Sequence, residues 1–178
     1  MTVAPASTGI GADVFRELMG ALAAGVSVVT TVDADGAPRG LTTTAVTSVS
    51  ADPPLLLVCV GVHSRTLPAI RASGRFAVNV MHEWAEETAA RFASKVEEKF
   101  VGSAWRPGRY GCPLLHEETL AWAECRVEQE VEAGDHVVLI GRIEHGGAAE
   151  LEHGPLTYYR RRFGTWISAD PERKGRAA

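Results

Sequence analysis

A segment dense in small and hydroxyl-bearing residues lies between positions 40 and 50 and reads GLTTTAVTSVS. Its hydroxyl groups come from Thr42, Thr43, Thr44, Thr47, Ser48 and Ser50. On a strand and the loop after it, small side chains allow a flat ring to approach the backbone, while amides and hydroxyls bind ring carbonyls and phosphate oxygens. An ordinary Thr-rich edge strand has the same composition. Composition alone leaves both interpretations open.

The tetrapeptide HSRT at 63–66 is a candidate anion site. Ser64 is placed to cap a predicted helix, and Arg65 and Thr66 stand next to it. Hydroxyls, free amides, the helix dipole and a guanidinium together can hold a phosphate. A plain helix cap with a solvated arginine is the alternative, and these residues alone favour it.

A third candidate is His136. Gly134 and Asp135 predict a hairpin turn, which places His136 at the mouth of the following strand rather than in the core. A histidine at a strand end is more often structural than functional.

The segment PLTYYRRRF at 155–163 is predicted to form one strand. Alternation then sends Tyr158, Arg160 and Arg162 to one side. It sends Tyr159, Arg161 and Phe163 to the other. Aromatics and arginines in this arrangement are compatible with an oligomer interface, a ring-stacking surface, or both.

The sequence lacks the familiar hydrolytic and phosphate-cradling motifs GxSxG, GxGxxG, the P-loop and HExxH. Its six histidines are scattered, with no spacing that brings two imidazoles to one face for a metal. A chain without its own nucleophile or metal can still be an enzyme when a cofactor supplies the reactivity.

The candidate residues described above lie mostly on predicted strands. A short amphipathic helix is predicted from Asp13, as its cap, to Gly25, where it ends. The β-rich segments 26–32 and 39–50 flank the turn DADG and predict a hairpin. The apolar run 55–61 predicts a strand buried on both faces, near the centre of a sheet.

The second half alternates before it returns to strands. A helix is predicted from Ser64 to Gly74, a strand over 75–81 and a helix over 84–100. A long hairpin follows from about 120 to 146. We therefore expect one α+β domain, built on an antiparallel barrel or closed sheet with peripheral helices.

The chain has 178 residues and fits one domain, for which we expect residues 13–167, with mobile tails at 1–12 and 168–178. A formal charge of −4 offers no overall attraction to nucleic acid or to an anionic membrane. The three cysteines are odd in number and widely spaced, which favours reduced thiols. Without a signal or membrane segment, the cytoplasm is the expected compartment.

Taken in order, the motifs resemble the flavin reductase family of FMN-binding split-barrel proteins. The landmarks are FRELMGALAAGVSVVTT, GLTTTAVTSVSADPPLLLVCV, HSRTLPAI, SGRFAVNV, ARFASK, GDHVVLIGRI and PLTYYRRRF, which run from Phe15 to Phe163. The resemblance implies a mainly β fold, a six-stranded antiparallel split barrel with peripheral helices. It also implies a homodimer with flavin near the interface.

The resemblance implies an enzyme that reduces FMN or FAD with NADH or NADPH and supplies diffusible reduced flavin to a monooxygenase. Matching positions imply flavin or nicotinamide contacts at Thr43, Thr44, Ala45, Val46, Ser50, Cys59, Val60, Ser64, Arg65, Phe92, Tyr159 and Arg160. They imply that His136 orients the nicotinamide. Two alternatives are a flavin carrier or sensor that does not turn over, and a split-barrel oxidoreductase with fixed FMN that acts on an organic substrate.

Two positions depart from the family pattern. Ala45 stands where the family often has serine, and Arg161 stands where glycine commonly follows Tyr-Arg. The three arginines at 160–162 are compatible with recognition of the 2′-phosphate of NADPH and equally with a surface role.

Overall fold

The computed structural model describes residues 9–149, 153–167 and 169. Most of both expected tails lies outside them. The main sheet has seven strands in the order β3-β2-β6-β9-β10-β5-β4, and each neighbouring pair is antiparallel. These strands are β2 (Ser27–Val32), β3 (Pro38–Thr43), β4 (Val46–Ala51), β5 (Pro54–Gly61), β6 (Arg75–Met81), β9 (Thr119–Ala133) and β10 (His136–Ala148).

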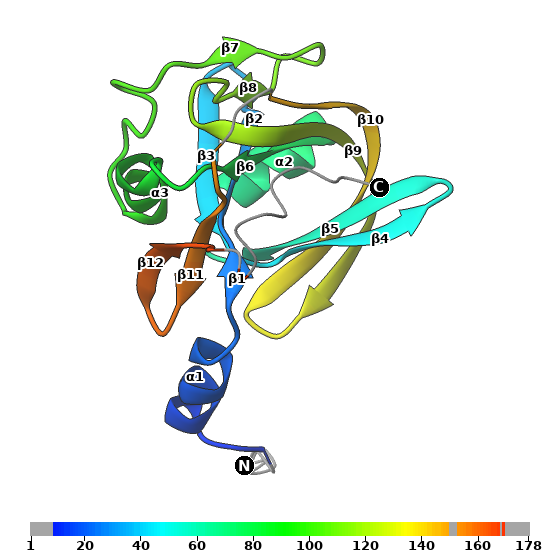
Figure 1. The fold of residues 1–178 in the computed structure, drawn as a ribbon. Helices are drawn as coiled ribbons and strands as arrows, with labels where there is room; N and C mark the ends of the chain where they lie inside the picture. The colour runs from blue at the N-terminus through cyan, green and yellow to red at the C-terminus, as the bar shows by residue number, and fades with distance from the viewer. Residues whose placement is uncertain (1–8, 150–152, 168, 170–178) are drawn as a thin grey trace, which may run out of the picture.

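The sheet is closed into a barrel (Figure 1). β3 and β4 stand at opposite ends of the strand order, yet only Thr44 and Ala45 separate them along the chain. Three residue steps span at most about 11 Å, so the two ends of the sheet must meet. Counted as one bent strand, β3 and β4 give the six strands expected. We call the junction Thr43–Val46 the seam.

The interior of the barrel is a hydrophobic cluster that includes Leu56, Val58 and Val60 of β5 together with Phe76 and Leu139. These three β5 side chains alternate with partly buried ones. The prediction that β5 is buried on both faces was therefore wrong, because only its inward face is closed off from solvent. The strand also lies between β4 and β10, next to one end of the order, and not at the sheet centre.

A small second sheet has the order β1-β11-β12, with β1 (Ala24–Gly25), β11 (Leu156–Tyr159) and β12 (Arg162–Thr165). A two-stranded sheet joins β7 (Arg106–Pro107) to β8 (Pro113–Leu114). The single strand predicted over 155–163 was wrong, because the chain reverses at Arg160 and Arg161, which have φ of 46° and 63°. The predicted alternation of side chains therefore does not continue past Tyr159.

Helix α1 (Ala12–Gly20) projects from the barrel (Figure 1) and buries none of its side chains. Its N-cap residue is Gly11, and Asp13 lies in the first turn, where it pairs with Arg16. The helix ends at Gly20, with Ala21 as its C-cap residue, and Gly25 belongs to β1. Both predicted boundaries were therefore displaced.

The other helices, α2 (Thr66–Ser73) and α3 (Glu86–Ala93), lie against the barrel. Gly74 ends α2 in the left-handed conformation, as predicted. Helix α3 is much shorter than the predicted 84–100, because the backbone turns extended at Ser94, and side chains bond to carbonyls around this end. Arg65 donates to the carbonyls of Lys95 and Val96, and the Lys99 ammonium donates to that of Phe92.

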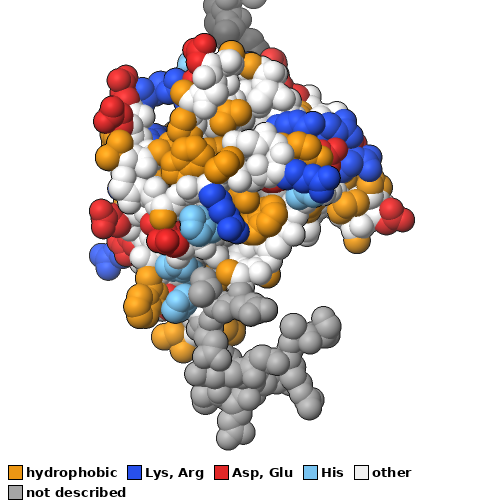
Figure 2. Space-filling model, turned by 90° about the horizontal axis from the view of Figure 1, so that it is seen from above, with side chains coloured by type: hydrophobic (Ala, Val, Ile, Leu, Met, Phe, Trp, Pro, Cys, Tyr) orange, Lys and Arg blue, Asp and Glu red, His pale blue; other side chains and the backbone are white. Residues whose placement is uncertain are grey.

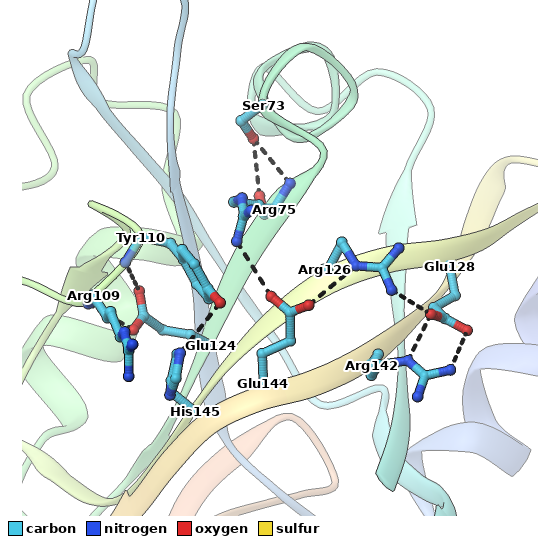
Figure 3. A network of polar contacts seen from close by, with 10 residues as sticks. All are labelled: Ser73, Arg75, Arg109, Tyr110, Glu124, Arg126, Glu128, Arg142, Glu144 and His145. Atoms are coloured by element: carbon cyan, nitrogen blue, oxygen red, sulfur yellow. Dashed lines mark hydrogen bonds and ion pairs between the residues drawn. The ribbon is translucent and has the colours of Figure 1, made fainter. Parts of the chain in front are cut away.

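Outside the barrel interior, ten residues form a polar network over β6, β9 and β10 (Figure 3). Glu144 accepts hydrogen bonds from Arg75 and Arg126, and Glu128 accepts from Arg126 and Arg142. A neighbouring carboxylate, Glu124, is fully buried and accepts the backbone N–H groups of residues 109 and 110. The network therefore ties the segment before β8 to the barrel wall.

Figure 2 looks onto the end of the molecule where β7 and β8 lie. Hydrophobic side chains gather in the middle of this face, and arginine or lysine side chains gather to one side with acidic side chains among them. Charge on this face is therefore mixed rather than of a single sign.

In the part of the chain that the structure describes, every helix is too short or too polar to span a bilayer.

Candidate functional site

A pocket of about 600 Å³ opens beside the seam. Its walls come from β3 and the seam, one residue of β5, the end of α3, the start of β10 and the β11–β12 hairpin. The lining residues are Val26, Thr42, Thr43, Thr44, Ala45, Cys59, Ala90, Ala93, Ser94, His136, Tyr158, Arg161 and Phe163. Pockets of this size are typical of small-molecule and cofactor sites.

Hydrogen bonds of the seam itself hold its shape. The Thr43 hydroxyl accepts the N–H of Ala45 at 3.0 Å, and the Ala45 carbonyl accepts the N–H of Cys59 at 3.0 Å. Thr44 and Ala45 are exposed, and their side chains are small. The backbone here is consequently open to the approach of a flat ring.

The wall formed by α3 is held to β3 by Thr42, whose hydroxyl donates to the Ala89 carbonyl of α3 at 2.6 Å. Ala90 and Ala93 of the same helix line the pocket. Alanines on this face of α3 therefore leave open the space that larger side chains would fill.

His136 begins β10 and is held by the residue before it. Its Nδ1 lies 2.7 Å from a carboxylate oxygen of Asp135, and its side chain is 51% exposed. The hydrogen bond to His136 lowers the pKa of Asp135, so this carboxylate remains ionised and orients the imidazole. The ring can therefore contact a bound molecule.

The pocket's cysteine is not set up as a nucleophile. Burial raises the pKa of the Cys59 thiol, which keeps it protonated at neutral pH. The other two thiols lie away from the pocket, and burial raises the pKa of Cys112 and Cys125 to about 12. The lining residues include no carboxylate among the described part of the chain, so the pocket's chemistry depends on what it binds.

Five of the thirteen residues expected at the site line this one pocket: Thr43, Thr44, Ala45, Cys59 and His136. Thr43 ends β3 and His136 begins β10, so these residues are as much as 93 positions apart in the sequence. The barrel therefore gathers the hydroxyl-rich segment and the strand-end histidine.

Other expected residues lie outside the lining. Val60 and Phe92 are fully buried in the core, so their side chains are closed off, and half-buried Val46 packs against the same core as Val60. Ser50 lies towards the far end of β4, opposite Leu55. Tyr159 is 46% exposed on the hairpin.

Ser64 and Arg65 lie before α2, outside the pocket's lining. The Ser64 hydroxyl accepts the N–H of Thr66 at 3.2 Å, but the N-cap residue of α2 is Arg65, so the prediction that Ser64 caps the helix was displaced by one position. Arg65 contacts the segment after α3 and pairs with Glu97 at 3.2 Å. Arg160 lies at the hairpin tip, with its guanidinium 5.4 Å from the Tyr159 ring centre.

Eight lining residues were missing from the expected set: Val26, Thr42, Ala90, Ala93, Ser94, Tyr158, Arg161 and Phe163. Thr42 belongs to the hydroxyl-rich segment and could have been included on that signal. Tyr158 and Phe163 pair across the hairpin with ring centres 5.1 Å apart. Finding them required the reversal at Arg160 and Arg161, which the sequence pattern does not indicate.

Comparisons with known proteins identify the relatives of this architecture. A family model described as "Flavin reductase like domain" matches residues 19–166. The chain is 45% identical to "Flavin reductase (NADH)" of Kitasatospora aureofaciens, over 91% of this chain and 86% of the relative. It is 39% identical to "Flavin reductase (NADPH)" of Lentzea aerocolonigenes, over 85% and 88%.

A further relative is "Flavin-dependent monooxygenase, reductase subunit HsaB" of Mycobacterium tuberculosis, 38% identical over 89% of this chain and 83% of its own. Among solved structures, the NADH:FAD oxidoreductase SgcE6 of Streptomyces globisporus in complex with NAD and FAD fragments has a TM-score of 0.81. It is 31% identical and covers 88% of this chain and 93% of its own.

The chain belongs to the flavin reductase-like domain family, and its barrel is the split barrel of that family. It is a flavin reductase, an enzyme of the oxidoreductase class.

Proposed function

We propose that this flavin reductase uses NADH or NADPH to reduce FMN or FAD and releases the reduced flavin to a separate flavin-dependent monooxygenase. The observation that carries the proposal is the pocket itself. It has a small-residue wall beside an open backbone, a held imidazole and no carboxylate among its described lining residues. Support also comes from relatives named for NADH, for NADPH and as a monooxygenase reductase subunit.

The pocket fits a flavin ring. Thr43, Thr44 and Ala45 offer a shallow wall with hydroxyl and amide groups for a ring edge, and Tyr158 and Phe163 add aromatic surface. The volume of about 600 Å³ suits a planar ring with part of a second one.

When bound together, the two coenzymes supply hydride transfer between their rings. The chain's task is to hold the rings in contact and to orient them, which converts an encounter in solution into a step within one complex. We assign the ring wall to Thr43–Ala45 and the orientation of the nicotinamide to His136. We assign Ser64 and Arg65 to the flavin phosphate. Arg65 bonds to the carbonyls of Lys95 and Val96, which directly follow the pocket-lining Ser94.

The test is an oxidation assay on the purified protein. A colourless preparation that oxidises NADH or NADPH only after FMN or FAD is added supports the proposal. A yellow preparation without NAD(P)H oxidation would favour a flavin carrier or sensor. Tightly held FMN with turnover only on an organic substrate would favour an oxidoreductase with a fixed flavin.

We also propose that the protein is a homodimer and that α1 lies in the interface. Val14, Phe15, Leu18 and Met19 of this helix are each at least 42% exposed, and Leu22 after it is 63% exposed. A projecting helix with an uncovered hydrophobic face is unusual in a monomer. A second copy of the chain would cover it.

A further inference from the structure

Arg161 is the only lysine or arginine among the described residues that line the pocket. It also borders a second hollow, of about 640 Å³, between α1 and the hairpin. It therefore stands between the proposed ring site and an adjoining space.

The Arg161 guanidinium has no carboxylate partner within the described residues. The ion pairs found there engage other arginines, among them Arg16, Arg65 and Arg142. The neighbouring Arg160 has the Tyr159 ring near its guanidinium. An exposed cation beside a pocket, without an acidic partner, is a ready site for an anionic group.

The backbone at Arg161 carries a cost that a glycine would avoid. Tyr159 pairs with Arg162, so Arg160 and Arg161 form a two-residue hairpin loop, and both have positive φ. Loops of this kind favour Asn-Gly, because positive φ crowds the side chain of an ordinary residue. The Arg160 N–H donates to the Gly20 carbonyl at 2.8 Å, which holds the loop against the end of α1.

We propose that Arg161 is a phosphate-binding residue of the pocket, and that it binds a phosphate group of one of the two substrates. Both the nicotinamide donor and a flavin mononucleotide or dinucleotide carry phosphate, and both must be placed at this pocket. The proposal rests on the proposed function for the identity of these ligands. Three observations on this chain carry the choice of residue. Arg161 has no carboxylate partner among the described residues, it lies on the pocket wall, and a strained loop presents it.

The experiment measures equilibrium binding to the full-length protein and to Arg161→Gly. FMN is compared with riboflavin, which lacks the phosphate, and ADP-ribose is compared with adenosine, which lacks the pyrophosphate. Glycine suits the loop, so the variant should fold with a Tm equal to or above that of the parent. Arg162→Ala is the matched control, because Arg162 belongs to the same hairpin but does not line the pocket.

We expect Arg161→Gly to raise the Kd of FMN or of ADP-ribose about tenfold, while the Kd of the phosphate-free counterpart stays unchanged. An effect on FMN alone would assign the residue to the flavin, and an effect on ADP-ribose alone would assign it to the donor. Arg161→Lys should restore part of the affinity. Arg162→Ala should change none of these constants.

The proposal is overturned if Arg161→Gly leaves both Kd values unchanged, or weakens each ligand and its phosphate-free counterpart equally. It is also overturned if the parent protein binds none of the four ligands. Flavin reduction by the parent protein with NADH or NADPH keeps the two proposals apart. Turnover in the parent together with unchanged Kd values in Arg161→Gly contradicts only the assignment of Arg161, whereas no turnover in the parent with either donor contradicts the reductase activity.

Discussion

The imidazole of His136 is oriented by its own neighbour in the chain. With Nδ1 bound to Asp135, the other nitrogen lies towards Gly61, where a Cβ atom would stand 3.9 Å from it. A Cβ at this distance would make only ordinary van der Waals contact, so position 61 does not crowd the ring.

Replacing His136 by alanine should raise the KM for NADH or NADPH several-fold and leave the flavin KM within about twofold, because the residue is assigned to the nicotinamide alone. Asp135→Asn should shift the same KM in the same direction by loosening the ring. Steady-state kinetics with each substrate varied in turn measures both values. His116→Ala, outside the pocket, is the control, and an unchanged donor KM in His136→Ala would remove this histidine from the site.

At the level of single elements, the turns were predictable because their residues carry the geometry. Gly74 ends α2 with φ of 65°, and Gly134 makes the β9–β10 turn with φ of 65°. The extent of α3 was not predictable, since residues 94–100 have helical composition but the carbonyls of Lys95 and Val96 accept hydrogen bonds from Arg65, which is distant in the sequence. The β11–β12 turn was missed for the opposite reason, because arginines occupy positions that favour glycine.

The packing of β3 on α3 should be sensitive to one methyl group. A Cβ at Gly40 would lie 2.7 Å from the Phe92 ring, which is fully buried and has no room to retreat. Gly40→Ala should destabilise the fold by about 1–3 kcal/mol through overpacking. Urea unfolding measures the loss, and Gly25→Ala, where nothing lies within 4 Å, should be close to neutral. Equal stability of the two variants would contradict the tight contact.

The polar network over β9 and β10 should make the stability of the fold decrease at acidic pH. Hydrogen bonding from Arg142 lowers the pKa of Glu128, and bonding from Arg126 lowers that of Glu144. The folded-state pKa lies below the unfolded one, so this stabilisation is present above about pH 4.3 and is lost as the pH falls through the folded-state value.

Thermal unfolding between pH 6 and pH 3 tests this dependence. Glu128→Gln should lower Tm at pH 6 and lose less Tm on acidification than the parent does, because the amide does not titrate. Added salt should reduce the difference, since the pairs are partly exposed. Parallel Tm curves for the two proteins would show that Glu128 contributes nothing to the acid sensitivity.

For the whole molecule, the barrel was predictable because the hairpins and the hydroxyl-rich segment follow one another along the chain in an order that resembles one family. The pocket was only partly so: its seam and His136 followed from motifs, whereas Tyr158, Phe163 and Arg161 depend on how the second sheet packs beside the barrel. Contacts between distant segments, such as Thr42 with Ala89, have no local sequence signal.

The quaternary structure should depend on the hydrophobic face of α1. Leu18→Glu places a charge in the centre of that face and should convert a dimer to a monomer, as light scattering after size exclusion would measure. Glu17→Gln, on the same helix, should leave the mass unchanged. A parent protein that is monomeric at micromolar concentration would contradict the proposed interface.

The seam that closes the barrel also sets when a ligand can bind during folding. Each of its flanking strands forms a hairpin of its own, β2 with β3 and β4 with β5, and these can form early because their partners are close in sequence. The pocket needs both hairpins together with α3 and β10, so an open sheet contains no partial version of it. Flavin should accordingly slow unfolding and leave the folding rate nearly unchanged, because it recognises only the completed barrel.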